Sequence, residues 1–192
     1  MGVRAPAAPS RHPHSQPSPR KGERALGRHT VRSVTPEPLT ADAFAPFGDV
    51  IEASDRAEVM PINYGWTTRF NALSDVAVGD GQAILSIFRS KPLAPLVLKI
   101  FERHPLGSQA FMPLNGRPFL VAVAAPGEFD PAAVRVFRAE ANQGVNYGKG
   151  TWHHFLLALE AESDFLVVDR EGPGENLDEV ELSEADWIAV AL

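Results

Sequence analysis

The chain has 192 residues, of which 44% are hydrophobic and 22% are charged, and its formal net charge is −6 at pH 7. It contains no cysteine, which excludes disulfides, thiolate metal ligands and cysteine nucleophiles. No apolar run approaches the roughly 18 residues that a membrane-spanning helix needs. Residues 1–32 carry seven basic residues and one acidic residue, a net charge of +6, so residues 33–192 carry a net charge of −12. An acidic body argues against a nucleic-acid partner, and we expect a cytoplasmic globular protein.

The first 30 residues have the composition of a disordered basic tail. They are rich in Pro, Ser and Arg and show no apolar periodicity, so burial cannot offset their ordering entropy. The tail faintly resembles an organelle transit peptide, although its prolines oppose an amphipathic helix. We assign no function to its histidines and predict one folded domain over residues 31–192.

From residue 30 onward the sequence pattern is typical of β-strands. Residues 30–34 read as a strand, and Thr40 is a suitable N-cap for a short helix that Gly48 ends. Turn signals such as Asn115-Gly116 divide the runs that follow. The segment 176–192 fits a terminal helix or a terminal strand. The strand-like runs are 49–53, 81–90, 96–104, 109–114, 117–125, 133–140, 153–160 and 164–170.

These closely spaced runs predict an all-β fold, either a sandwich or a barrel. Several runs are apolar on both faces, which is typical of strands that lie between two layers.

One segment, "ERHPLGSQAFMPLNG", concentrates polar groups among the strands. Glu102 and His104 share one face of a strand because side chains alternate, and Gln109 can return to that face after the Pro-Leu-Gly bend. The spacing resembles the first motif of the cupin superfamily, in which a His-x-His pair and a downstream Glu hold a metal. Here Glu102 replaces the first His and Gln109 replaces the Glu.

The segment "YGKGTWHHF" resembles the second cupin motif. Gly148 and Gly150 make the turn, and His153 enters the barrel. His153 and His154 are adjacent, so on a strand they face opposite ways, and His154 is expected to be a structural or interface histidine. Both motifs in order imply a cupin-like double-stranded β-helix, or jelly-roll barrel, with one or two short helices.

The donor set suits a divalent metal. Imidazole binds nickel, zinc, copper and iron, and carboxylate or amide oxygens favour harder ions. The candidate ligands are His104, His153, Glu102 and Gln109. In the alternative the site is metal-free, and the two histidines only form hydrogen bonds with the Glu and the Gln.

Other polar residues are candidates for substrate binding. Arg89 or Arg69 could clamp a carboxylate bidentately, although such an arginine is more often a strand-end surface charge or half of a structural ion pair. Asp169 is a candidate too, with an ion pair to Arg170 as the alternative. Asn63 and Tyr147 could form hydrogen bonds to a ligand.

Taken together, "ERHPLGSQAFMPL", "QGVNYGKGTWHH" and "FLVVDREG" are similar to the ureidoglycolate lyase family, formerly called ureidoglycolate hydrolases. "INYG" with Arg69 and "SIFRSKP" with Arg89 fit the same pattern. The resemblance runs from about Val31 to near the C-terminus. Two departures are Gly148-Lys149, where the family has a bulkier pair, and Phe155, where proline is common.

This resemblance implies a homodimer that converts (S)-ureidoglycolate to glyoxylate and urea in allantoin and purine breakdown. Nickel is associated with the family, and a metal-free site is the alternative. His104, Glu102 and His153 are the candidate catalytic residues. Gln109 joins Arg89, Arg69, Asn63, Tyr147 and Asp169 as a candidate for substrate binding.

Three other functions fit the same residues. One is an amidohydrolase that releases ammonia from ureidoglycolate, and another is a non-catalytic cupin-like module that binds a small carboxylate. The third is a metal-dependent sugar or keto-acid isomerase, because fold does not fix function, although Gln109 in place of an acidic ligand counts against it.

Overall fold

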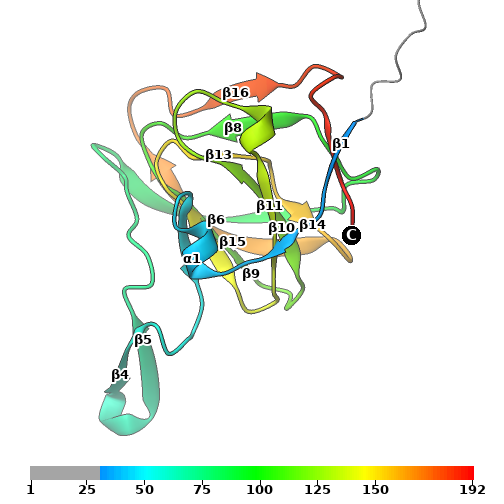
Figure 1. Cartoon of the computed structure of the whole chain (residues 1–192). Coiled ribbons are helices and arrows are strands. Elements are labelled where there is room, and N and C mark those ends of the chain that lie inside the picture. Colours follow the sequence, from blue (N-terminus) through cyan, green and yellow to red (C-terminus); the bar gives the residue numbers. More distant parts are fainter. Residues whose placement is uncertain (1–30) are drawn as a thin grey trace, which may run out of the picture.

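The computed structural model describes residues 31–192, and the predicted tail of residues 1–30 lies outside them. Within the described part, strands dominate and α-helix is confined to α1 (Ala41–Phe44) (Figure 1). Two 3-10 turns span Asn63–Gly65 and Pro131–Ala133. The strands are β1 (Arg32–Val34), β2 (Glu37–Pro38), β3 (Gly48–Ile51), β4 (Glu58–Ile62), β5 (Thr67–Asn71), β6 (Gln82–Ser90), β7 (Val97–Leu98), β8 (Ile100–Arg103), β9 (Gln109–Pro113), β10 (Phe119–Ala124), β11 (Arg135–Ala139), β12 (Gly144–Tyr147), β13 (Trp152–His153), β14 (Leu157–Ala158), β15 (Ser163–Glu171), β16 (Asp178–Glu181) and β17 (Ile188–Val190).

Two sheets pack face to face and enclose the main core. One has the order β16-β8-β13-β10-β11-β2, with β14 also paired to β10, and the other has the order β3-β12-β9-β15-β6. Phe119 from the first sheet meets Phe165 from the second with ring centroids 5.1 Å apart, Phe137 belongs to the same cluster, and all three are fully buried. Burying one such side chain contributes about 1.5–3 kcal/mol. The prediction of an all-β, cupin-like barrel with a short helix is confirmed.

A second apolar cluster covers the outer side of the longer sheet. There the small sheet β1-β17-β7 lies over β8 and β10. Every residue of β10 (Phe119–Ala124) is therefore buried. This is the physical reason for the run that is apolar on both faces, because the strand lies between two layers.

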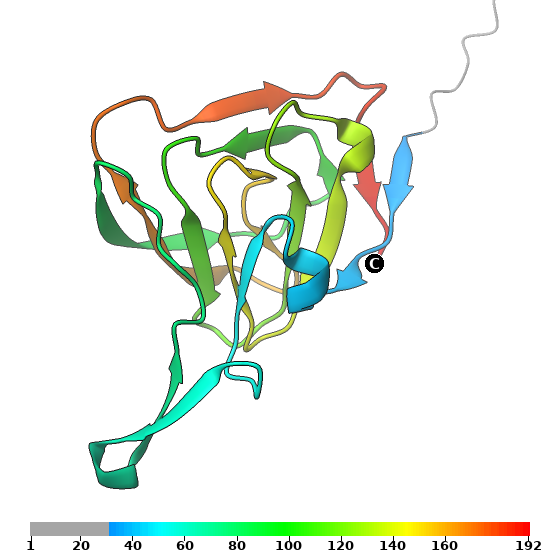
Figure 2. The ribbon, with the colours of Figure 1, turned by 60° about the vertical axis from the view of Figure 1, so that its left-hand side comes forward.

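The hairpin β4–β5 leaves the body of the molecule as an arm, residues 58–71 (Figures 1 and 2). Its strands pair antiparallel from Glu58 opposite Asn71 to Ile62 opposite Thr67. The only elements that contact this hairpin appreciably are its own strands and the turn between them, within residues 31–192. The sequence did not indicate it, since Pro61 interrupts the first strand and no apolar alternation marks either one.

The sequence predicted the start of the short helix correctly, but it did not predict where the helix ends. The Thr40 hydroxyl accepts from the Ala43 backbone N–H at 3.3 Å and caps α1 as expected, but the helix ends before Gly48, which instead begins β3. The C-terminal segment forms a strand, β17, parallel to β1. Among residues 31–192, no helix has the length and apolarity required to cross a membrane.

Gly48 is the position where a side chain is least tolerable. Its φ is 143°, and an added Cβ would lie 1.9 Å from the Asn146 carbonyl oxygen. We expect Gly48→Ala to lower the free energy of unfolding by at least about 2 kcal/mol, through strain and overlap. Urea denaturation of the variant measures this.

Gly148→Ala is the matched control. A Cβ there meets its nearest atom, the Phe47 carbonyl oxygen, at an ordinary 3.5 Å, so its effect should stay below about 1 kcal/mol. Equal losses in both variants would contradict the prediction.

Candidate active site

Strand register brings Glu102 and His153 together. In the antiparallel pair β8–β13, His153 lies directly opposite Glu102, so their side chains share the face that points between the two sheets. His104 follows β8 two residues after Glu102 and adopts the same direction. One ligand atom from each of Glu102, His104 and His153 lies within 4.8 Å of the others. Residues distant in sequence thus form one compact triad.

The His104 ring is held by a backbone carbonyl. Its Nδ1 lies 2.7 Å from the Asn176 carbonyl oxygen, and a carbonyl only accepts, so Nδ1 carries the hydrogen. Nε2 then presents its lone pair to the interior. Gln109 Oε1 lies 3.1 Å from this nitrogen. Two acceptors face each other there unless the amide turns its nitrogen to the ring or a proton or cation binds Nε2.

His153 is a buried neutral imidazole. Its side chain is 1% exposed, and its ring stacks on Tyr147 with centroids 4.3 Å apart. Burial, reinforced by the nearby His104, lowers the pKa of His153 to about 3. Its Nδ1 faces the His154 carbonyl oxygen at 3.3 Å, and the buried Nε2 has no hydrogen-bond partner within residues 31–192. This side chain offers an uncommitted lone pair.

Glu102 is partly desolvated beside these rings. Burial raises the pKa of the Glu102 carboxyl, the positive charge that His104 can carry opposes the rise, and the Glu179 carboxylate adds to it. Burial, and secondarily Glu102, also raises the pKa of the Tyr147 phenol. At neutral pH the phenol is therefore a hydrogen-bond donor, and the carboxyl can exchange a proton more readily than an ordinary glutamate.

The triad lies where two hollows meet. Glu102 and His153 line a hollow of about 530 Å³ together with Tyr147 and the edge strand β6. His104 lines an adjoining hollow of about 300 Å³ with Gln109 and Asp169. Asp169 Oδ1 is buried there without a hydrogen-bond partner among the described residues. Together the two hollows have room for a small oxyacid.

The candidate arginines and Asn63 lie outside the triad. Arg89 stands on the rim of the larger hollow, and its guanidinium makes a bidentate pair with Asp164, with Nε–Oδ1 2.6 Å and Nη2–Oδ2 2.9 Å. Arg69 and Asn63 lie on the arm and line neither hollow. Their assignments to the substrate stay predictions.

Arg170 has a structural partner other than Asp169. Its buried guanidinium binds Asp80 at 2.6 Å. It also donates to the carbonyl oxygens of Val78 and Pro173. The alternative of an Asp169–Arg170 ion pair is therefore wrong, and the Asp169 carboxylate is left to face the smaller hollow.

Sequence reasoning missed Asn176. This residue orients His104 through its backbone oxygen, while its side-chain Oδ1 accepts from the Leu106 N–H at 2.8 Å. It thereby ties the loop before β16 to the bend after His104. No sequence signal identifies it, because a backbone carbonyl is common to all residues and the contact spans 72 positions.

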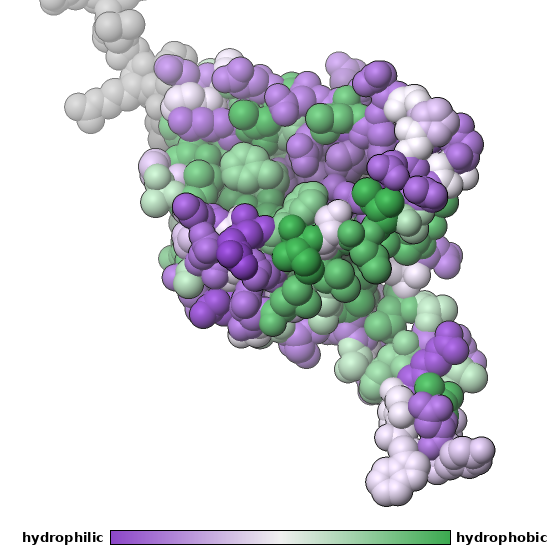
Figure 3. All heavy atoms as spheres, turned by 180° about the vertical axis from the view of Figure 1, so that it is seen from behind, coloured by the Kyte–Doolittle hydropathy of each residue, from purple (hydrophilic) through white to green (hydrophobic). Residues whose placement is uncertain are grey.

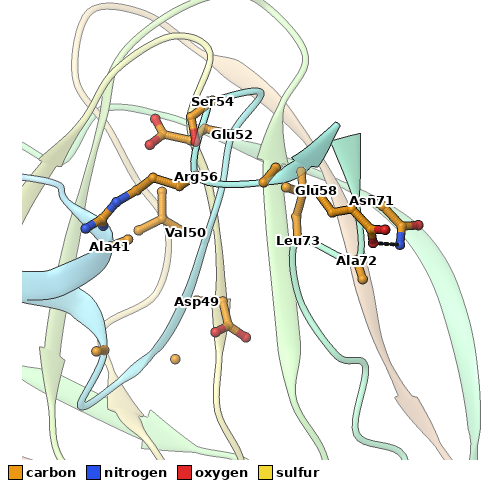
Figure 4. Close-up of a pocket in the computed structure, with 13 residues that line it drawn as sticks. Ala41, Asp49, Val50, Glu52, Ser54, Arg56, Glu58, Asn71, Ala72 and Leu73 are labelled. Atoms are coloured by element: carbon orange, nitrogen blue, oxygen red, sulfur yellow. Dashed lines mark hydrogen bonds between the residues drawn. The ribbon is translucent and has the colours of Figure 1, made fainter. Parts of the chain in front are cut away.

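A separate hollow of about 460 Å³ lies at the root of the arm (Figure 4). No histidine lines it, and most of its charged and amide side chains are already paired. Arg56 binds Asp42 at 2.9 Å, and Asn71 donates to Glu58 at 2.8 Å. Without a histidine, the side chain most often used for proton transfer, this hollow is a poorer candidate for acid–base chemistry than the triad.

A cupin-like barrel in which two imidazoles and a carboxylate converge beside a small hollow defines a class: enzymes that act on small molecules with acid–base or metal assistance. The comparisons identify the family. A model of the ureidoglycolate lyase family matches residues 31–189, and the chain belongs to this family.

Relatives agree with this assignment. The chain is 49% identical over 161 residues to the ureidoglycolate lyase of Burkholderia mallei, covering 82% of this chain and 94% of that one. It is 53% identical over 153 residues to that of Stutzerimonas stutzeri, covering 78% and 89%.

Among solved structures, Bacillus subtilis oxalate decarboxylase is 12% identical, with a TM-score of 0.37 over 71% of this chain and 28% of that one. A TM-score this low supports no inference about the site.

The two buried histidines predict acid sensitivity of folding. Burial lowers the pKa of His153 to about 3 and of His154 to about 4, from an ordinary 6.5. The unfolded chain therefore binds these protons first as the pH falls below 6.5. Stability present above pH 6.5 should fall toward pH 4, by about 1.4 kcal/mol per pH unit for each histidine.

Urea denaturation of chelator-treated protein at pH 7, 6 and 5 measures this loss. His154→Gln removes one of the two groups, so its stability should fall about half as steeply. Identical slopes for the variant and the parent chain would contradict the assignment to His154.

Proposed function

We propose that the chain is a ureidoglycolate lyase, which cleaves (S)-ureidoglycolate to glyoxylate and urea in allantoin and purine breakdown. The observation that carries the proposal is the convergence of Glu102, His104 and His153 at a hollow, in a chain about half identical to ureidoglycolate lyases. We further propose that residues 31–192 form the catalytic domain, that it works as a homodimer, and that it acts in the cytoplasm.

The reaction needs one proton removed and one delivered. In ureidoglycolate a single carbon bears a hydroxyl, a carboxylate and a urea nitrogen. Loss of the hydroxyl proton lets the oxygen form the aldehyde of glyoxylate as the carbon–nitrogen bond breaks. The departing nitrogen takes up a proton to become urea. A positioned base and acid each contribute about 10²–10⁴-fold to such a step.

His104 and Glu102 suit these two roles. With Nδ1 fixed on the Asn176 carbonyl, the His104 Nε2 lone pair can accept the hydroxyl proton. Glu102, whose pKa is raised by burial, can deliver a proton to the nitrogen. His153 keeps a pKa of about 3 and stays neutral, so it serves as a lone-pair donor and not as a proton shuttle.

The same residues fit a divalent metal ion. One ring nitrogen of His153 lies within 4.8 Å of ligand atoms of Glu102 and His104, and its Nδ1 is 3.8 Å from Glu102 Oε1. As the alternative to these acid and base roles, we propose that the three hold the ion with Gln109 as a fourth ligand, because the single lone pair of His104 Nε2 cannot bind a metal and accept a proton at once. The ion is then nickel, as the family resemblance implies. Such an ion would lower the pKa of the bound substrate hydroxyl.

The surrounding polar groups suit the two ends of the substrate. Asp169 Oδ1 is a buried acceptor that urea N–H groups can satisfy, and the Tyr147 phenol and Gln109 amide lie in the adjoining walls. Arg89 is the guanidinium on the rim of the larger hollow that can meet the carboxylate. It would have to exchange its contact with Asp164 for the substrate.

Assaying the purified protein with (S)-ureidoglycolate tests the reaction and its metal together. We expect urea and glyoxylate in equal amounts, loss of turnover with a chelator, and recovery on adding Ni²⁺. His104→Ala should lower the turnover at least about 100-fold while the protein remains folded.

The products separate the rival functions. Ammonia in place of urea would indicate the amidohydrolase, and thermal stabilisation by substrate without any product would indicate a binding module. Turnover unaffected by chelation would remove the metal and leave the lyase.

Asn176 should act as a positioning residue for His104. Asn176→Ala deletes the acceptor for the Leu106 N–H and frees the loop that presents the carbonyl to His104. We expect turnover or metal affinity to fall about 10–100-fold, and the ¹⁵N shifts of His104 to show a mixture of tautomers.

Asn176→Asp is the matched control, because it keeps an oxygen acceptor at the same place and should retain most of the activity. A single unchanged tautomer of His104 in Asn176→Ala would contradict this role.

A further inference from the structure

The arm has no partner within the described chain. Tyr64 is 105% exposed and Trp66 is 91% exposed, both at the tip. Tyr64 also has φ of 59°, a left-handed conformation that costs free energy for a bulky side chain. An isolated two-stranded hairpin is at best marginally stable in water. Packing against another surface would therefore stabilise the arm.

The five-stranded sheet presents an unpartnered surface on its outer side. Register places Leu85 opposite Val168, and Ile87 opposite Leu166, which in turn lies opposite Met112. The residues that alternate with these five, such as Phe111 and Val167, belong to the core. Because side chains alternate along a strand, the five residues just named point outward. We call Leu85, Ile87, Met112, Leu166 and Val168 the outer apolar face.

This face is open to solvent at its edge. Leu85 is 72% exposed and Ile87 is 56% exposed. Both belong to β6, which ends the sheet and pairs with β15 alone among the described strands. A long, apolar edge strand left uncovered is a ready site for association. Figure 3 shows the arm projecting from the body and apolar side chains on the body surface in the same view.

The arm and the outer apolar face lie on the same side of the sheet. Just after the arm, Ser74 and Asp75 receive hydrogen bonds from Asn146 Nδ2, at 2.7 Å and 2.9 Å. Asn146 lies opposite Ala110, which lies opposite Val168 of the outer apolar face. The chain that leads out of the arm thus crosses the same side of this sheet.

We propose that the arm of one copy packs on the outer apolar face of a second copy, in a two-fold symmetric dimer. This rests on the homodimer proposed above and names its surface. Each copy supplies one arm and one outer apolar face, so a two-fold symmetric dimer contains two equivalent contacts and covers both surfaces in each copy.

The area available matches a stable dimer. An aromatic side chain buries about 150–250 Å², so Tyr64 and Trp66 of two arms bury about 600–1,000 Å² in all. The surfaces that they cover lose a similar area. The sum is about 1,200–2,000 Å², which is the size of a standard stable interface.

Cross-linking tests the contact directly, because the chain has no cysteine of its own. A tagged copy with Trp66→Cys is mixed with an untagged copy with Ile87→Cys, allowed to exchange subunits, and treated with a short bis-maleimide. We expect a cross-linked heterodimer. A control copy with Leu192→Cys, at a site that is 80% exposed, should give none in place of Ile87→Cys.

Sedimentation equilibrium gives the second readout. Ile87→Asp should weaken the dimer at least about 30-fold, and Leu192→Asp should leave it unchanged. A monomeric parent chain at micromolar concentration, or a dimer that Ile87→Asp does not weaken, would overturn the proposal. Both measurements are made without substrate, so their failure is distinct from a failure of the proposed lyase activity.

Discussion

The site depends on the pairing of β8 with β13, in which Glu102 lies directly opposite His153. A strand presents alternate residues to opposite faces, so a slip of one residue would turn His153 outward and put a neighbour in its place. The neighbour His154 is already committed to the other side, where its ring meets Phe101 edge-on at a centroid distance of 5.7 Å. The two layers of core thus specify the register, and the register specifies the site.

The site has more acceptors than donors. His153 Nε2 and Asp169 Oδ1 are buried without hydrogen-bond partners among the described residues, and Gln109 Oε1 faces the lone pair of His104. Burial of such groups costs free energy unless something satisfies them. A cation, a proton or the N–H groups of urea would each do so. The same desolvation raises the pKa of Glu102 and lowers that of His153, which favours the neutral form of both.

Sequence reasoning reached the parts of the molecule that local patterns encode. Runs that are apolar on both faces indicated buried strands, and β10 confirms this. The spacing of Glu102 and His104 indicated a shared face because two residues on a strand always share one. The arm escaped because its side chains face solvent in this chain and no burial shapes their order. The Arg170–Asp80 pair and the Asn176–His104 contact escaped because each joins segments about 70–90 positions apart, which only the tertiary fold brings together.

In the proposed dimer, Arg69 and Asn63 would lie at the interface between the two copies. Within one chain they line neither hollow beside the triad. The strand β6 has two functions: Leu85 and Ile87 form part of the outer apolar face, while Phe88 and Arg89 line the larger hollow. An arm packed on β6 of a second copy therefore lies beside the rim of that copy's hollow. The polar residues of the arm, if they meet substrate, do so in the partner subunit, and dimerisation then becomes part of how the site is built.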